Sequence, residues 1–160
     1  MGKIITISPR LAVPTQNLLS AADFRLYLEE FNKKGSSALD YIPVQECNGK
    51  YYLLDGHHRM AVAFLANTRI RVFLPRNKED LMQESEFPGV SSADIFYMND
   101  NIERRFEDVI DFANTVSADY GINNMGDLIR KQVRRGDLDK IWEEVLHLPF
   151  PNQYLLQQIK

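Results

Sequence analysis

The dipeptide Asn48-Gly49, placed between two apolar runs, constrains the fold more than any other feature of this sequence. Asn and Gly both tolerate positive φ, so this pair favours a two-residue turn that joins antiparallel strands. The flanking runs, Tyr41-Ile42-Pro43-Val44-Gln45 and Lys50-Tyr51-Tyr52-Leu53-Leu54, are rich in β-branched and aromatic residues. The sequence therefore predicts a β-hairpin over residues 41–54, with Pro43 at the start or the edge of its first strand.

Further strands and helices are expected on both sides of this hairpin. After it, apolar residues recur at helical spacing within residues 57–67, and residues 69–74 alternate with period two. Before it, Lys3–Ile7 is a short β-branched run, and Ser20 is placed to cap a helix that Gly35 ends. The first part of the chain is therefore expected to form a small mixed β-sheet with helices.

The second half of the sequence has a different organisation. Residues 76–100 contain Phe87-Pro88-Gly89 and have the composition of a loop, which sets a boundary after residue 76. Three amphipathic stretches follow, and Gly136 is expected to stop the second of them. We therefore predict an α+β fold in two parts, a sheet-containing unit at residues 1–76 and a helical extension at residues 77–160 that packs on it.

Composition limits the classes of protein to which this chain can belong. The single cysteine, Cys47, excludes a disulfide framework within the chain and a zinc site built from several cysteines. No apolar run reaches the roughly 18 residues that span a bilayer, so we expect a cytoplasmic protein with no membrane partner. Residues 1–76 carry ten Lys and Arg against six Asp and Glu, whereas residues 77–160 carry nine against sixteen. Anions are therefore attracted to the first half, and the helical extension is acidic.

The motif Asp55-Gly56-His57-His58-Arg59 is the best candidate for a functional site. Gly56 permits a sharp turn, and the first amides of the helix that follows have no partners within that helix. The positive end of the helix dipole favours an anion such as phosphate, and Arg59 can bind the same anion through two hydrogen bonds. Asp55 can bind a divalent metal or act as a base on a hydroxyl. The same residues also fit a purely structural turn, in which Asp55 caps the helix and pairs with Arg59.

The hairpin, this motif and the helix after it together resemble the ParB/sulfiredoxin superfamily. The superfamily motif is a glycine, two variable residues, an arginine and then small residues, and Gly56, Arg59 and Ala63 match it. The resemblance covers residues 3–75 and is most specific over residues 42–74. It implies a ParB/sulfiredoxin-like fold that binds a nucleotide, ATP or CTP, together with Mg²⁺.

The resemblance also implies roles for individual residues. The residues expected around the phosphates are Gly56, His57, His58 and Arg59. Asp55 is the expected metal ligand, and Asp55 and His57 are the candidate catalytic residues. Sulfiredoxins use ATP and a cysteine directly after the motif glycine, where this chain has His57, and ParB proteins bind and hydrolyse CTP while clamping on DNA. A free-serine kinase branch has an acid before the glycine, as Asp55 is here, and a glutamate near the N-terminal loop, where the nearest residue is Gln16. We therefore expect an NTPase or a kinase-type phosphotransferase.

Two other functions remain open at this point. The first is a non-catalytic ParB-like module that associates with nucleotide or DNA. A basic stretch around Gly136 suits phosphate contacts from a helix-turn-helix, although acidic residues dilute it. Its basic residues are Arg130, Lys131, Arg134, Arg135 and Lys140. The second is a protein-interaction domain in which the Asp55–Arg59 motif is only a turn.

Overall fold

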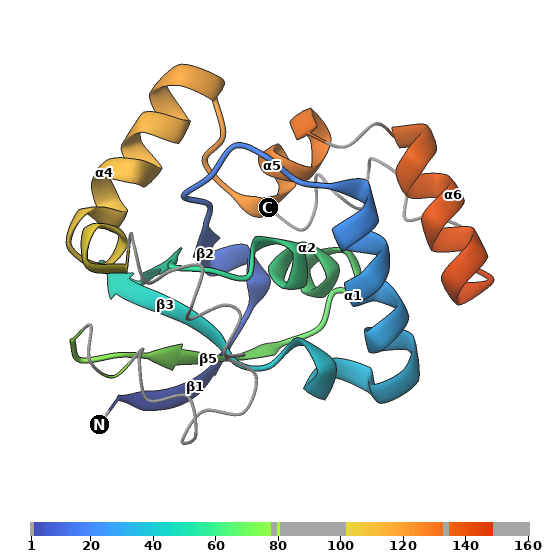
Figure 1. The fold of residues 1–160 in the computed structure, drawn as a ribbon, viewed down its shortest axis with the longest axis horizontal. Helices are drawn as coiled ribbons and strands as arrows, with labels where there is room; N and C mark the ends of the chain where they lie inside the picture. The colour runs from blue at the N-terminus through green and yellow to red at the C-terminus, as the bar shows by residue number, and fades with distance from the viewer. Residues whose placement is uncertain (1, 78–79, 81–101, 133–134, 149–160) are drawn as a thin grey trace.

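A mixed sheet with the strand order β1-β5-β3-β4-β2 underlies the first part of the chain (Figure 1). The computed structural model describes residues 2–77, 80, 102–132 and 135–148. The strands are β1 (Lys3–Ile7), β2 (Ala12–Val13), β3 (Ile42–Cys47), β4 (Lys50–Leu53) and β5 (Ile70–Leu74). β1 pairs with β5 and β3 with β4 in antiparallel fashion, whereas β3–β5 and β2–β4 are parallel pairs. The mixed α+β class expected from the sequence is confirmed.

The hairpin forms at the predicted turn. Asn48 and Gly49 have φ values of 54° and 77°, which are the positive values that a tight turn between twisted strands requires. The register places Val44 opposite Leu53, and both side chains are fully buried. The amide of Leu54 then donates to the carbonyl of Pro43 at 3.0 Å, which holds β4 against β3 up to the point where the chain turns. The hairpin therefore fixes where the Asp55–Arg59 motif begins.

Five α-helices lie in the described residues. They are α1 (Ala21–Lys34), α2 (His57–Leu65), α4 (Ile102–Tyr120), α5 (Met125–Gln132) and α6 (Arg135–Leu146), and two 3-10 turns, η1 (Pro9–Leu11) and η2 (Gly35–Leu39), flank α1 and β2. Ser20 caps α1, because its Oγ accepts from the amide of Asp23 at 3.3 Å, and Gly35 ends that helix with φ 75°. Eight of the nine α2 residues are buried, so α2 is the central helix of the fold.

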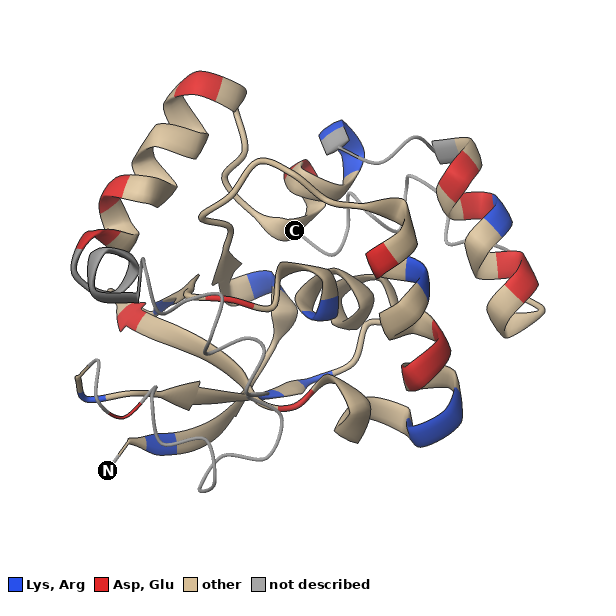
Figure 2. Ribbon diagram, viewed as in Figure 1, with Lys and Arg blue, Asp and Glu red and all other residues tan. Residues whose placement is uncertain are grey.

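The C-terminal helices pack on the first part of the chain. Buried side chains of α5 and α6, such as Leu128 and Trp142, belong to the same hydrophobic core as Phe64 of α2. α6 lies along α1 (Figure 1), where the Asn32 side-chain amide donates to the carbonyl of Val145 at 3.2 Å. Both α4 and α6 carry acidic residues along their length (Figure 2). None of the helices in the described residues is both long and apolar enough to cross a membrane.

One expected helix end is wrong. The sequence predicts that Gly136 stops the second of the C-terminal helices, but α5 already ends at Gln132, and Gly136 lies in the first turn of α6. A glycine near the start of a helix lowers the stability of that helix only a little. Asp137 in the same turn interacts favourably with the helix dipole. Most of the segment expected to be a loop, residues 76–100, lies outside the described residues.

Candidate functional site

The turn between β4 and α2 is shaped by the backbone of Gly56. Gly56 is the N-cap residue of α2 and adopts the left-handed conformation, with φ 79° and ψ 31°. Gly56 has no side chain of its own with which to cap the helix. The first hydrogen bond within the helix runs from the amide of Met60 to the carbonyl of Gly56 at 2.9 Å. The amides before Met60 therefore have no acceptor within the helix.

Gly56 is also required by its surroundings. A Cβ atom at this position would lie 3.2 Å from both Cγ atoms of Ile42 and 3.1 Å from Nη2 of Arg59. Ile42 is fully buried in β3, where it cannot move away easily. The glycine therefore allows the chain to turn tightly over the sheet while the Arg59 side chain passes close to the backbone.

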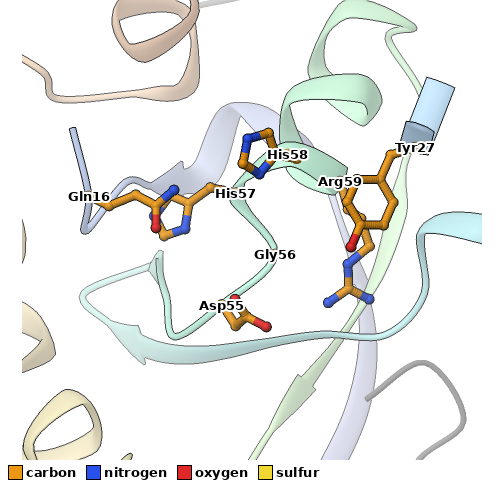
Figure 3. A pocket seen from close by; sticks show the side chains of 7 residues that line it. All are labelled: Gln16, Tyr27, Asp55, Gly56, His57, His58 and Arg59. Atoms are coloured by element: carbon orange, nitrogen blue, oxygen red, sulfur yellow. The ribbon is translucent and has the colours of Figure 1, made fainter. Parts of the chain in front are cut away.

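A pocket of about 180 Å³ opens at this turn. Its lining residues are Gln16, Tyr27, Asp55, Gly56, His57, His58 and Arg59 (Figure 3). All five residues of the predicted motif therefore meet in one cavity. Gln16 and Tyr27 come from the loop after β2 and from α1, and Figure 3 shows them on opposite sides of the turn. Among the lining residues, Asp55 carries the only carboxylate and Arg59 the only guanidinium.

Arg59 is positioned by a network that includes Asp40, just before β3, and Arg71 of the neighbouring strand β5. Its side chain is 5% exposed, and its Nη1 donates to the backbone carbonyl of Asp40 at 3.4 Å. The Asp40 carboxylate in turn accepts from Nε of Arg71 at 2.8 Å, from Nη2 of Arg71 and from the Arg71 amide at 3.3 Å. The Arg71 guanidinium also lies 4.9 Å from the centre of the Tyr41 ring. The backbone that contacts Arg59 is therefore held by a buried carboxylate with three donors.

The ring of His57 faces the loop that precedes α1. It is 1% exposed, and its Nε2 accepts from the amide of Thr15 at 3.0 Å. The Thr15 hydroxyl, 3.4 Å from the same nitrogen, donates to the carbonyl of Leu53 at 2.6 Å. The sequence motif predicts a catalytic and phosphate-binding role for His57. The structure shows its ring in a hydrogen bond to the loop, while its backbone belongs to the start of α2.

His58 contacts the same loop at its other end. Its Nε2 accepts from the amide of Ser20 at 2.8 Å, and its ring stacks on Tyr27 with centroids 6.5 Å apart. Burial lowers the pKa of His58 below its ordinary value of 6.5, while the Asp23 and Asp55 carboxylates oppose this shift. At neutral pH the ring is therefore uncharged and holds the N-cap of α1. No pattern in the sequence indicates this contact.

The residues present are compatible with a magnesium ion that arrives with a phosphate ligand. The described residues contain no group of three or more His, Cys, Asp or Glu side chains arranged to hold a metal by themselves. Mg²⁺ is usually bound by one or two carboxylates together with substrate phosphates and water, rather than by a complete protein cage. The Asp55 carboxylate, which lines the pocket, fits that requirement.

Two of the five basic residues considered for DNA binding have contacts within the protein, whereas Arg134 and the side chain of Arg135 lie outside the described residues. Arg130 donates to the Asp127 carboxylate at 2.5 Å, and Nζ of Lys131 donates to the carbonyl of Tyr120 at 3.0 Å. Side chains engaged in this way lose part of their capacity to bind nucleic-acid phosphates.

Comparison of the chain with protein-family models, with curated proteins and with solved structures gives no match. The resemblance to the ParB/sulfiredoxin superfamily therefore stays a prediction from the sequence motif.

Proposed function

We propose that this protein binds a nucleoside triphosphate, ATP or CTP, through its phosphates at the turn between β4 and α2. One observation carries the proposal: the N-terminus of α2, which begins at Gly56 in the left-handed conformation, adjoins a pocket that Arg59 also lines. Amides at the positive end of a helix bind phosphate, and a guanidinium adds charge-assisted hydrogen bonds. The motif's resemblance to the ParB/sulfiredoxin superfamily supports the same ligand.

The size of the pocket decides which part of the nucleotide it holds. Its volume is about 180 Å³, whereas pockets that enclose a drug-sized ligand measure roughly 300–1,000 Å³. The phosphates therefore occupy the pocket, and the nucleoside lies outside it. This arrangement makes the phosphates the main source of affinity, so tripolyphosphate is expected to bind and to compete with the nucleotide.

Turnover of the nucleotide is assigned to Asp55. As the only carboxylate in the lining, it would hold Mg²⁺ against the phosphates or orient the attacking hydroxyl or water. Arg59 would neutralise the charge that develops on the phosphate oxygens. The His57 imidazole is occupied by the Thr15 amide, so the reaction does not require it as a base. These roles describe an NTPase or a phosphotransferase.

Thermal shift with a panel of nucleotides tests the binding step. ATP, CTP, GTP, UTP and tripolyphosphate are each added with and without Mg²⁺. A ligand at 100 times its Kd stabilises the folded state by about 2.7 kcal/mol, which is a readily measured shift in Tm. No shift with any of these compounds at millimolar concentration contradicts the proposal.

Two variants connect binding and turnover to the named residues. Arg59→Met keeps most of the side-chain volume and removes the guanidinium, so it is expected to weaken tripolyphosphate binding. Arg69→Met removes an exposed arginine outside the pocket lining and serves as the matched control. Asp55→Asn is expected to keep binding and to lose turnover. Retained turnover in Asp55→Asn contradicts the assigned mechanism, and binding without turnover in the unmodified protein identifies a non-catalytic nucleotide-binding module.

A further inference from the structure

Two adjacent imidazoles hold the two ends of one loop. Nε2 of His57 accepts from the amide of Thr15 at 3.0 Å, and Nε2 of His58 accepts from the amide of Ser20 at 2.8 Å. The six residues from Thr15 to Ser20, here called the Thr15–Ser20 segment, are therefore held at both ends by side chains that are neighbours in sequence. Gln16, which lies inside this segment, is part of the pocket lining.

The direction of these hydrogen bonds fixes the protonation state of both rings. A backbone amide can only donate, so each Nε2 must present a lone pair, and the proton of each neutral ring lies on Nδ1. If Nε2 of His58 became protonated, two N–H groups would face each other across 2.8 Å. The hydrogen bond to Ser20 therefore exists only while His58 is uncharged.

We infer that His58 is a proton-sensitive switch: its neutral ring holds the Ser20 end of the Thr15–Ser20 segment, and protonation of its Nε2 releases that end. The Thr15 end stays in place, because the His57 ring is 1% exposed and the Thr15 hydroxyl also binds the carbonyl of Leu53 at 2.6 Å. The segment therefore pivots at Thr15. Because Ser20 is also the N-cap of α1, its release loosens the first turn of that helix.

The charged groups around His58 supply an alternative partner for the protonated ring. Asp23 on α1 and Asp55 before α2 both interact electrostatically with it, and Arg59 lines the same pocket. The Tyr27 ring, stacked on His58 at an interplanar angle of 23°, keeps the imidazole between α1 and the turn. A protonated His58 can therefore exchange the Ser20 amide for a carboxylate. Burial favours the neutral form, so the change occurs below the ordinary histidine pKa of 6.5.

The switch has a consequence for the pocket that rests on the proposed function. Release of the Ser20 end frees the part of the segment that follows Gln16, a residue of the pocket lining, and so loosens one side of the proposed phosphate site. The contact between His58 and Ser20 can be tested without any ligand, so a failure of phosphate binding and a failure of the switch give different results.

Amide NMR of the ligand-free protein tests the switch. Spectra are recorded between about pH 5 and about pH 8, the range in which histidine changes charge. The Ser20 amide signal is expected to follow the titration of His58 with a midpoint below 6.5, and the Thr15 amide signal is expected to move much less. Long-range imidazole spectra at neutral pH are expected to show Nε2 of His58 without a proton.

A matched pair of variants isolates the residue. His58→Gln keeps an acceptor near the position of Nε2 but cannot titrate, so the Ser20 amide signal should become independent of pH. His147→Gln removes a histidine that lies outside the pocket lining and should leave the Ser20 titration unchanged. A Ser20 signal that does not move with pH, or that still titrates in His58→Gln, overturns the inference. So does a protonated Nε2 at neutral pH, which is measured on the unmodified protein and needs no variant to fold.

Discussion

Replacing Gly56 by alanine separates two requirements that the turn places on this residue. The first is the left-handed backbone, with φ 79°, and the second is the space between Ile42 and Arg59. Gly49 provides an internal control, because it has nearly the same φ of 77° and a Cβ atom at that position would meet no other atom within 4 Å. Gly49→Ala therefore measures the backbone requirement alone, and Gly56→Ala measures both.

The two costs can be worked out from these contacts. A non-glycine residue in the left-handed region costs about 1–2 kcal/mol. Alanine recovers about 0.4–1 kcal/mol by restricting the unfolded chain, which leaves roughly 1 kcal/mol for Gly49→Ala. Gly56→Ala adds contacts of 3.1 Å to Arg59 and 3.2 Å to Ile42, and overpacking of this kind costs about 1–3 kcal/mol more. The free energy of unfolding should therefore fall by about 2–4 kcal/mol in Gly56→Ala.

Urea denaturation measures this difference directly. With an m value of about 2 kcal/mol/M, the midpoint of Gly56→Ala should lie roughly 0.5–1.5 M below that of Gly49→Ala. Tripolyphosphate affinity should fall in Gly56→Ala, because the added methyl displaces the guanidinium of Arg59, and should be unchanged in Gly49→Ala. Equal midpoints for the two variants would refute the reasoning, since they would show that Ile42 and Arg59 do not crowd position 56.

Other perturbations give separate expectations for the same unfolding assay. Ser20→Ala removes the cap of α1 and should cost about 1 kcal/mol. Phe64→Ala empties a fully buried site in the core and should cost about 3–5 kcal/mol. Asp40→Asn breaks the ion pair with Arg71 and should cost about 1 kcal/mol. The cost should be smaller at high salt, because the Arg71 side chain is 48% exposed. As pH falls below 6.5, the unfolded chain binds more protons at His58 than the folded chain does, so the free energy of unfolding should fall, and His58→Gln should remove this dependence.

Local signals are sufficient to predict most of the elements near the site. Asn48-Gly49 predicts the hairpin because both residues accept positive φ, and the structure has both there. Ser20 and Gly35 mark the ends of α1 for equally local reasons. Gly136 misleads the prediction because a glycine stops a helix only when its backbone turns left-handed at the C-terminus, and here it stands at the start of the next helix.

Some features of the site can also be predicted from neighbouring residues, whereas others depend on residues distant in sequence. Its five motif residues are contiguous in sequence, so their meeting in one pocket can be predicted before the tertiary structure is known. The role of the two imidazoles is not predictable, because their partners Thr15 and Ser20 lie 42 and 38 residues earlier in the chain. The place of Tyr27 in the site is not predictable for a related reason. Its helical spacing on α1 is that of a core residue, and only the packing of α1 on α2 brings its ring against His58.

The two helices that meet at the pocket begin in opposite ways, and the difference bears on what the site is for. α1 has a serine cap and an aspartate in its first turn, the usual means of satisfying the exposed amides and the positive end of the dipole. α2 has a glycine cap, no acidic residue in its first turn, and Arg59 there instead. The positive charge at that end is what a bound phosphate would neutralise under the proposed function.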